Sequence, residues 1–409
     1  MQDFIPHPFS KPLYVMAKPS GAACNLACDY CYYLDKSLLY PEKKTEMSPD
    51  TLERYIRQYI NAQTGSEVIF TWHGGEALLR PISFYQRALE LQELYGRQKG
   101  VSVINTLQTN GTLLTDEWCE FFRVNGFLVG ISLDGPEAYH DAFRRNKAGA
   151  PSFDRVIRGV RLLQKHGVEF NILAVVNSLN AEDPIGFYRF FKELGCQYIQ
   201  FAPIVERRDS FSLVSVLRKD LEVTKQTVRP EQWGNFLIGL FDEWIRRDVG
   251  KVFVQIFDST LANWVGETPG LCTLTKYCGH AGVMEYNGDL YSCDHFVFPE
   301  FYLGNIYEQS ISEMMESGRQ YRFGRDKYDT LPNRCKECEY LFACWGECPK
   351  NRFAVTEDGE PGLNYLCEGY FRFFRYVAPY MDWMKKALLE GKAPAGIMNA
   401  LRKGRVPGV

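Results

Sequence analysis

The sequence lacks the features that define several large classes of protein. Its formal net charge is only −3 over 409 residues, so no basic excess favours nucleic acid or an anionic membrane surface. No run approaches the roughly 18 apolar residues that a membrane helix needs. Residues 1–6 form neither the basic nor the apolar region of a secretory signal. We therefore expect a cytoplasmic protein that binds neither nucleic acid nor membranes.

Strand-like and helix-like segments alternate from residue 13 to about residue 245. Apolar, partly β-branched runs, each followed by a loop and a helical pattern, occur at 13–18, 67–72, 101–107, 127–133, 169–176 and 197–204. Six such units predict an α/β fold whose parallel sheet is curved into a partial (β/α)6 barrel. Parallel sheets place their chemistry at the carboxyl ends of the strands, so functional residues are expected in the following loops.

The character of the sequence changes after about residue 266, where cysteine density rises and long helical periodicity fades until about residue 365. This pattern indicates a small domain stapled by metal. We expect a barrel over 1–245, a linker over 246–265, a cluster-binding domain over 266–370 and a C-terminal helix and tail over 371–409. The tail is expected to be an exposed terminal helix with a frayed end.

The cysteines number 13 and are clumped, which in a reducing compartment favours metal sites over disulfides. Three of them follow the first predicted strand as Cys24-x3-Cys28-x2-Cys31. Three thiolates hold three corners of a 4Fe–4S cubane and leave one iron open to a small molecule. A zinc site short of one ligand and a reactive thiol cluster remain alternatives.

Eight further cysteines lie in the C-terminal region. They are Cys272, Cys278, Cys293, Cys335, Cys338, Cys344, Cys348 and Cys367. Eight thiolates complete two 4Fe–4S clusters, although the same number also fits two zinc ribbons. Cys119 and Cys196 stand alone and are expected to be ordinary core residues.

The three-cysteine loop resembles the signature of the radical S-adenosylmethionine superfamily. An aromatic residue, Tyr30, precedes its last cysteine, and the likeness extends over about residues 13–205. It includes the segments Trp72-His73-Gly74-Gly75-Glu76, Gln108-Thr109-Asn110-Gly111 and Ser132-Leu133-Asp134-Gly135-Pro136. In that superfamily the open iron chelates the methionine moiety of S-adenosylmethionine, whose reductive cleavage gives a 5′-deoxyadenosyl radical.

The resemblance implies a set of cofactor contacts. These are Tyr30, Gly74, Gly75, Glu76, Gln108, Ser132, Asp134, Arg144 and Val205. A proline often follows the Gly-Gly-Glu motif in the family, whereas Ala77 stands here. For Arg144 a solvated surface position is the alternative, and His73 is expected to support its loop.

The C-terminal cysteines resemble the SPASM domain of enzymes that mature ribosomal peptides and proteins. That likeness implies interleaved ligands for two auxiliary 4Fe–4S clusters. Cys272, Cys278, Cys293 and Cys348 would hold the nearer cluster, and Cys335, Cys338, Cys344 and Cys367 the farther one. Iron–sulfur clusters, and not zinc, fit this domain best beside the three-cysteine loop.

Within this group the chain is most similar to anaerobic sulfatase-maturating enzymes, through the eight ligands, residues 72–76 and the Tyr-Ser-Cys-Asp-His-Phe segment at 291–296. The family oxidises a cysteine or serine of a nascent or unfolded sulfatase to formylglycine, with an electron donor such as flavodoxin or ferredoxin. Its base follows the third auxiliary cysteine, which here gives Asp294. A carboxylate with a reference pKa of about 3.9 is ready to accept a proton. A supporting or turn position is the alternative for Asp294.

Two other functions remain open at this point. A SPASM maturase could form a thioether or another cross-link in a peptide. The other alternative is not an enzyme but an iron–sulfur electron carrier. The open iron argues against it, because a carrier has no use for a vacant coordination site. Serine and cysteine both remain open as the target side chain.

Overall fold

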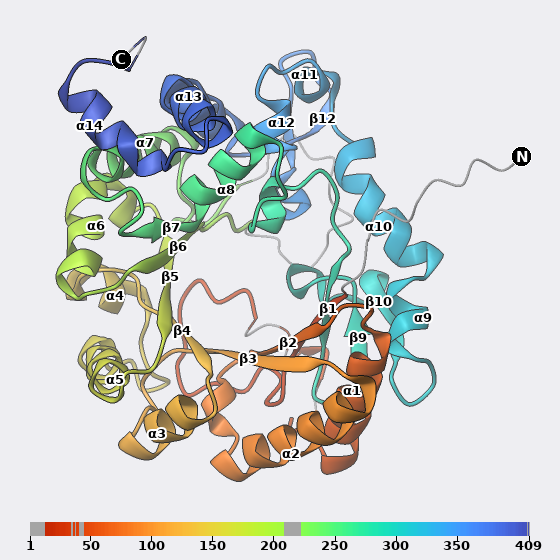
Figure 1. Ribbon diagram of the computed structural model, residues 1–409. Helices are drawn as coiled ribbons and strands as arrows, with labels where there is room; N and C mark the ends of the chain where they lie inside the picture. The colour runs from red at the N-terminus through yellow and green to blue at the C-terminus, as the bar shows by residue number, and fades with distance from the viewer. Residues whose placement is uncertain are drawn as a thin grey trace, which may run out of the picture. The chain divides into compact units, whose positions relative to one another are not determined.

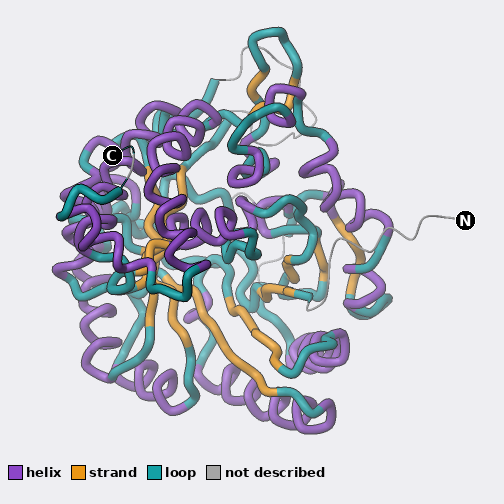
Figure 2. Tube along the Cα trace, turned by 45° about the horizontal axis from the view of Figure 1, so that its top comes forward, coloured by secondary structure: helices purple, strands orange, loops and turns teal. Residues whose placement is uncertain are grey.

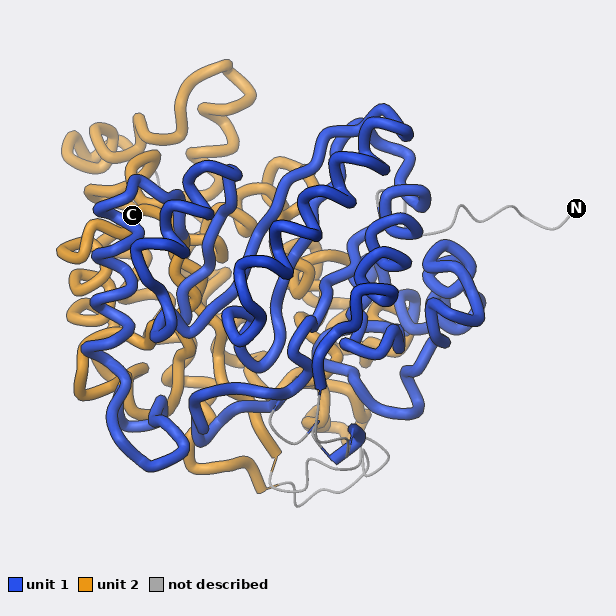
Figure 3. The backbone as a smooth tube through the Cα atoms, turned by 90° about the horizontal axis from the view of Figure 1, so that it is seen from below, with its two compact units in different colours: residues 1–132, 141–170, 277–326 blue, residues 133–140, 171–276, 327–409 orange. Residues whose placement is uncertain are grey.

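The computed structural model describes residues 13–33, 36, 38–40, 45–207, 222–406 and 408. The N-terminal residues 1–6, expected to lack a secretory signal, lie outside these ranges. The chain forms two compact units that interleave along the sequence (Figure 3). Unit 1 comprises residues 1–132, 141–170 and 277–326, and unit 2 comprises residues 133–140, 171–276 and 327–409. The compact units therefore divide the chain differently from the domain boundaries expected from the sequence.

Unit 1 contains a sheet in the strand order β10-β9-β8-β1-β2-β3-β4 (Figure 1). The strands are β1 (Tyr14–Ala17), β2 (Glu67–Trp72), β3 (Ser102–Thr109), β4 (Leu128–Ser132), β8 (Ala281–Met284), β9 (Asp289–Tyr291) and β10 (Tyr302–Asn305). Strands β8, β1, β2, β3 and β4 run parallel, whereas β9 and β10 are antiparallel additions at the β8 edge. The C-terminal strands thus extend the sheet on the far side of β1.

Helices and strands alternate along the chain, drawn in purple and orange in Figure 2, and the helices of unit 1 follow its strands. They are α1 (Pro49–Ala62), α2 (Ile82–Lys99), α3 (Asp116–Val124), α5 (Phe153–His166) and α9 (Ile311–Met315), with short turns η2 (Ala77–Leu79), η6 (Asp294–Phe296) and η7 (Pro299–Phe301). Ser48 caps α1 by accepting a hydrogen bond from the Thr51 amide. Helix α5 ends at Gly167, whose φ of +65° is the left-handed conformation that glycine allows.

Unit 2 contains the parallel strands β5 (Phe170–Val176), β6 (Tyr198–Pro203) and β7 (Phe253–Val254) and the antiparallel pair β11 (Ala354–Val355) and β12 (Pro361–Leu363). Its helices are α6 (Pro184–Glu193), α7 (Pro230–Arg247), α8 (Gln255–Val265), α11 (Asn333–Lys336), α12 (Leu341–Cys344), α13 (Cys367–Leu389) and α14 (Ile397–Arg402), with turns η3 (Asn180–Glu182), η5 (Cys272–Leu274), η8 (Pro349–Asn351) and η9 (Pro394–Gly396). Two further helices, α4 (Glu137–Phe143) and α10 (Gly318–Asp329), contribute residues to both units. Helices α7 and α13 pack against each other (Figure 1). Their contact includes the buried rings of Phe241 and Phe373.

All six apolar runs identified in the sequence form strands, which confirms the α/β fold. The expectation of a linker over 246–265 is wrong, because these residues contain the end of α7, strand β7 and helix α8. Ile256, Phe257 and Trp264 of α8 are buried, so the segment belongs to the core of unit 2. The tail is also less exposed than expected, since Ile397 of α14 is fully buried and α14 packs against α7.

Candidate active site

The three-cysteine loop follows β1 in unit 1 and is fixed by backbone hydrogen bonds to the end of α4 and the segment after it. The Ala27 amide donates to the Arg145 carbonyl at 2.8 Å, and the Asp29 amide donates to the Phe143 carbonyl at 3.0 Å. The Cys31 amide donates to the Cys28 carbonyl at 3.0 Å, which closes a tight turn between two of the thiols. The loop is therefore held from outside, and the partly exposed thiols of all three cysteines are free of disulfides.

The Gly-Gly-Glu segment lies directly against the start of this loop. The Gly75 amide donates to the Gly21 carbonyl and the Glu76 amide to the Ala23 carbonyl, both at 2.8 Å. A Cβ atom at position 75 would lie 2.2 Å from the Ala23 carbonyl oxygen. Only glycine permits this approach of one backbone to the other.

Glu76 joins the segment to the polar loop after β3. Its side chain is almost fully buried and accepts hydrogen bonds from Thr109 Oγ1 at 2.6 Å, from the Asn110 amide at 2.8 Å and from the Leu78 amide at 2.9 Å. Burial raises the pKa of Glu76 above its ordinary value, while these three hydrogen bonds oppose the rise. Glu76 therefore organises the neighbouring loops, and its contact with the cofactor stays a prediction.

Four of the predicted cofactor residues form two hydrogen-bonded pairs in unit 1. Gln108 Nε2 donates to Ser132 Oγ at 3.0 Å, at the carboxyl ends of β3 and β4. Arg144 donates to the Tyr30 hydroxyl at 3.0 Å, and only 7% of Arg144 is exposed. The alternative of a solvated surface position for Arg144 is thus wrong.

The remaining two predicted cofactor residues belong to unit 2. Asp134 is fully buried and accepts a hydrogen bond of 2.9 Å from the Val175 amide of β5. Val205 follows β6 and is buried. Both lie just after strands, as the sequence indicates.

A network of amide side chains beside the first cysteine was not anticipated from the sequence. Asn110 Nδ2 donates to Asn25 Oδ1 at 2.8 Å, and Asn25 Nδ2 donates to Thr112 Oγ1 at 2.8 Å. Asn110 Nδ2 also lies 3.8 Å from Cys24 Sγ. Two features of the sequence could have indicated this network: Asn25 adjoins Cys24, and Asn110 belongs to the polar loop after β3.

Asp294 begins η6, one residue after Cys293, and lies in a buried cluster of charged and aromatic side chains of unit 1. Its Oδ1 is 2.6 Å from the ammonium nitrogen of Lys18, and its Oδ2 accepts a hydrogen bond from the Tyr32 hydroxyl. Burial alone would raise the pKa of Asp294, but the charge and hydrogen bond of Lys18, together with His73 and His295, outweigh it and hold the pKa well below its usual range. The carboxylate is therefore ionised at neutral pH.

Lys18 and His73 complete one side of this cluster. The ammonium of Lys18 is fully buried and lies 3.3 Å from His73 Nδ1, which also accepts a 2.7 Å hydrogen bond from the Gly74 amide. Burial, assisted by the charge of Lys18, lowers the pKa of His73 to about 4. Because two donors face Nδ1, the imidazole is neutral and carries its proton on Nε2. His73 thus supports its loop, as expected.

A second buried carboxylate, Glu285, lies on the other side of the cluster. It is 1% exposed and accepts a hydrogen bond from the Tyr33 hydroxyl. Burial raises the pKa of Glu285 to about 7. Sequence reasoning missed both Lys18 and Glu285, although each directly follows a strand, and the last residues of those strands, Ala17 and Met284, are paired in the parallel ladder of β1 and β8.

Four of the C-terminal cysteines line one cavity of about 310 Å³ in unit 2. They are Cys335, Cys338, Cys344 and Cys367, the set expected to hold the farther auxiliary cluster. Aromatic side chains, including Tyr340 and Phe374, form the rest of the wall and give the thiols an apolar surrounding. The cavity and its four thiols fit a cubane cluster, whose cysteine ligands stand at separate corners.

The other set is divided between the units. Cys278 and Cys293 belong to unit 1, whereas Cys272 and Cys348 belong to unit 2. In unit 2 the buried ammonium of Lys327 donates to the Cys272 and Thr273 carbonyls, both at 2.8 Å, and so fixes the turn that carries Cys272. The assignment of these four cysteines to the nearer cluster stays a prediction.

Among the described residues, no three His, Cys, Asp or Glu side chains converge as closely as a single metal ion requires. Cys119 and Cys196 are buried in the core, as expected, and burial raises the pKa of both thiols. Within the same residues, no helix has the length and apolar character needed to span a bilayer.

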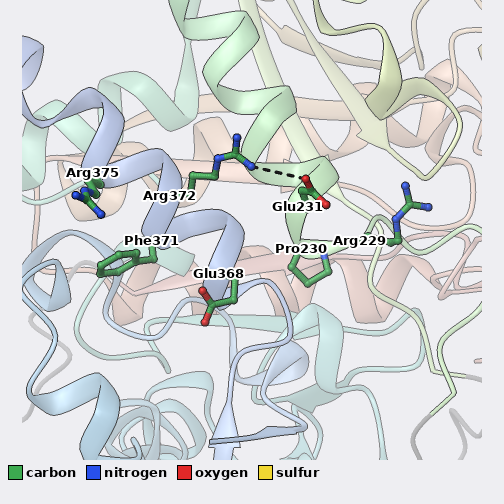
Figure 4. A pocket seen from close by; sticks show the side chains of 7 residues that line it. All are labelled: Arg229, Pro230, Glu231, Glu368, Phe371, Arg372 and Arg375. Atoms are coloured by element: carbon green, nitrogen blue, oxygen red, sulfur yellow. Dashed lines mark ion pairs between the residues drawn. The ribbon is translucent and has the colours of Figure 1, made fainter. Parts of the chain in front are cut away.

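A second hollow of about 540 Å³ adjoins the cysteine cavity and shares Glu368 and Phe371 with it. Figure 4 shows the side chains that line it, which are Arg229, Pro230, Glu231, Glu368, Phe371, Arg372 and Arg375. Arg372 lies 3.9 Å from Glu231 in the ion pair drawn there. The first turn of α13, which begins at Cys367, thus separates a group of guanidinium side chains from the four thiols.

Comparison with protein families matches residues 19–191 to the radical SAM superfamily and residues 278–339 to the SPASM family, described as an iron–sulfur cluster-binding domain. The first match lies within the range of residues that resembles the superfamily in the sequence. The second includes four of the eight C-terminal cysteines, which are Cys278, Cys293, Cys335 and Cys338. The chain accordingly binds S-adenosylmethionine and 4Fe–4S clusters, including auxiliary clusters, and the zinc-ribbon alternative is wrong.

Two known proteins resemble the whole chain. A serine-type anaerobic sulfatase-maturating enzyme of Bacteroides thetaiotaomicron is 63% identical over 403 residues, which is 97% of each chain. A cysteine-type enzyme of Clostridium perfringens is 32% identical over 375 residues, 90% of this chain and 97% of that one. Among solved structures, native anSMEcpe with bound AdoMet and the Cp18Cys peptide matches with a TM-score of 0.82 and 30% identity, over 92% of this chain and all of that one.

Proposed function

The chain belongs to the anaerobic sulfatase-maturating enzymes, and we propose that it oxidises a serine side chain of a sulfatase to formylglycine. The observation that carries the proposal is the ionised carboxylate of Asp294, held by Lys18 and Tyr32 one residue after Cys293. The preference for serine is supported by the 63% identity to a serine-type enzyme, against 32% to a cysteine-type one.

The oxidation removes two hydrogen atoms from the serine side chain. When bound, the cofactors supply a 5′-deoxyadenosyl radical that takes a hydrogen atom from the β-carbon and an iron–sulfur acceptor for the last electron. The remaining proton, on the side-chain oxygen, has to be taken up by the protein. Asp294 is suited to this step because its carboxylate is already ionised and lies in a largely buried site.

The other residues of unit 1 bind and orient. We assign Cys24, Cys28 and Cys31 to the catalytic cluster, and the pairs Tyr30–Arg144 and Gln108–Ser132 to the cofactor. A buried guanidinium suits the carboxylate of S-adenosylmethionine, because it can donate two parallel hydrogen bonds. Asp134 and Val205 of unit 2 are assigned to the same cofactor by their positions after strands.

The macromolecular substrate is a nascent or unfolded sulfatase, because the target side chain has to reach the largely buried carboxylate of Asp294 as part of an extended segment. For the electron donor we propose an acidic carrier such as a flavodoxin or a ferredoxin. The support is the hollow beside the cysteine cavity, where Arg229, Arg372 and Arg375 present positive charge (Figure 4).

Two peptides that differ only in the target residue, serine or cysteine, test the proposed function. The anaerobic holoenzyme is incubated with each peptide, S-adenosylmethionine and a reductant, and the product is treated with a hydrazine reagent that captures aldehydes. Formylglycine made from serine and a cross-link both lose two hydrogen atoms, so mass alone does not separate them. We expect a captured aldehyde on the serine peptide. A mass loss without an aldehyde would support the cross-linking alternative, and absence of 5′-deoxyadenosine would support a simple electron carrier.

A further inference from the structure

Lys18 is a lysine in a place where lysine is rarely found. It follows β1, its side chain has 0% exposure, and its backbone amide donates to the Met284 carbonyl at 2.9 Å. Burying an ammonium is unfavourable unless partners compensate its charge. The buried charge of Lys18 therefore indicates a specific role for this side chain.

The ammonium of Lys18 has three partners from three segments of unit 1. Its nitrogen lies 2.6 Å from Asp294 Oδ1, 3.3 Å from His73 Nδ1 and 4.0 Å from the centre of the Tyr33 ring. An ammonium carries three hydrogens, so these contacts use its whole donor capacity. The imidazole and the ring are neutral, which leaves Asp294 as the counter-charge in direct contact.

The two oxygens of Asp294 are held differently. Oδ2 accepts the hydrogen bond from Tyr32, whereas Oδ1 faces the Lys18 ammonium at 2.6 Å. An ionised carboxylate has about four lone-pair positions, so these two contacts leave room for a proton. Lys18 and Tyr32 together fix the plane of the carboxylate.

We propose that Lys18 is a positioning residue for proton removal, holding the Asp294 carboxylate in place so that it receives the proton of the substrate hydroxyl. The inference rests on the proposed function of Asp294. In this step the O–H bond of the substrate radical breaks and its proton goes to the carboxylate. The carbon–oxygen double bond forms, and the remaining electron passes to an oxidised iron–sulfur cluster. Lys18 neither gains nor loses a proton.

The test compares Lys18→Met, which removes the charge but keeps the chain length, with Lys18→Arg, which keeps the charge. Misplacing a reacting group by about 1 Å can cost about 10²-fold in rate. We therefore expect aldehyde formed per 5′-deoxyadenosine to fall by about 10²-fold in Lys18→Met, with iron content, cofactor cleavage and peptide KM close to parental. Lys18→Arg should recover part of the ratio. Lys36→Met is the matched control, because Lys36 is also buried in unit 1 and packs over the Phe298 ring; it should leave the ratio unchanged.

The double variant Lys18→Met/Asp294→Asn separates this inference from the proposed function. If Lys18 acts through Asp294, the double variant gives the same ratio as Asp294→Asn within about twofold, as coupled sites require. The comparison also holds if Lys18→Met alone does not fold, because the double variant leaves no unpaired charge. A further loss in the double variant, or a parallel fall of aldehyde and 5′-deoxyadenosine in folded Lys18→Met, would overturn the inference. A parental ratio in Asp294→Asn would instead overturn the proposed function.

Discussion

Gly75 packs so closely against Ala23 that a Cβ atom at position 75 would lie 2.2 Å from the Ala23 carbonyl oxygen. This contact joins the Gly-Gly-Glu segment to the loop that carries Cys24, Cys28 and Cys31. Any side chain at position 75 must push the two backbones apart, because the obstructing atom belongs to the main chain.

Gly75→Ala is therefore expected to weaken the catalytic cluster site. Overpacking of this kind costs about 1–3 kcal/mol, and here the displacement falls on the cluster loop itself. We expect reconstituted protein to contain about eight irons in place of about twelve, since only the catalytic cluster is affected. Gly65→Ala is the control, because a Cβ there meets nothing closer than 3.9 Å. Full iron content in Gly75→Ala would contradict the assignment.

Replacing the cysteines assigned to one cluster should remove the iron of that cluster alone. Replacing Cys335, Cys338, Cys344 and Cys367 together with alanine should leave about eight irons per chain, because one four-iron cluster is lost. Replacing Cys24, Cys28 and Cys31 should leave the same number and also abolish cleavage of S-adenosylmethionine. The buried Cys119 and Cys196 provide controls, whose replacement by alanine should leave about twelve irons. Loss of more than one cluster's iron from the first variant would contradict the proposed grouping.

Glu285 predicts a pH dependence of stability. Its pKa in the folded protein is about 7, above the ordinary value of 4.5, because the carboxyl is buried. The folded state therefore holds a proton that the unfolded state releases between these pH values, so the contribution is present below about pH 4.5 and is lost as the pH rises through 7. At about 1.4 kcal/mol per pKa unit, the loss amounts to about 3 kcal/mol.

Glu285→Gln removes this titration and should flatten the dependence. The measurement is the free energy of unfolding of the holoenzyme, obtained with denaturant at pH values from about 5 to about 8, the range in which Glu285 titrates. The exposed Glu117→Gln is the control and should keep the parental slope. An unchanged slope in Glu285→Gln would show that other groups cause the pH dependence.

The arginines of the hollow in Figure 4 predict how the electron carrier binds. Arg372→Glu/Arg375→Glu reverses two charges beside the cysteine cavity, and both side chains are exposed. We expect slower electron exchange with an acidic carrier at low salt and an unchanged rate with a small chemical reductant, because mutations of surface charges mainly alter association. The exposed Arg246→Glu/Arg247→Glu on α7 is the matched control. Equal effects in the two double variants would contradict docking at this hollow.

The sequence was sufficient for strands β1 to β6 and for the local motifs. The close spacing of Cys335, Cys338 and Cys344 predicts that they share a site, and these residues line one cavity. Each apolar run bounded by polar loops forms a strand. Helix α8 was missed because its N-cap residue, Val254, has no side chain that can cap it, and strand β7 because two residues show no periodicity. Local patterns of this kind reveal an element only when its ends are marked.

The buried charge cluster was not predictable in the same way. The contact of Lys18 with Asp294 depends on β8 lying beside β1 and on β9 following beside β8, and sequence periodicity does not specify which strands are neighbours. The rule that chemistry lies at strand ends did not single out position 18, and it could not reach position 285 because no strand was predicted before it. Nothing in the residue pattern showed that these two ends meet, so the counter-charge of Asp294 remained hidden until the sheet order was known.

Asp294→Asn, assayed with a serine peptide labelled with deuterium at the β-carbon, tests the central claim most directly. The amide keeps the shape of the side chain but cannot take the proton, and a general base typically contributes about 10²–10⁴-fold. With iron content matched to the parent, we predict that captured aldehyde falls by a factor of that order while 5′-deoxyadenosine falls much less and deuterium returns to S-adenosylmethionine. Aldehyde formation at the parental rate would contradict the account and remove Asp294 from the mechanism.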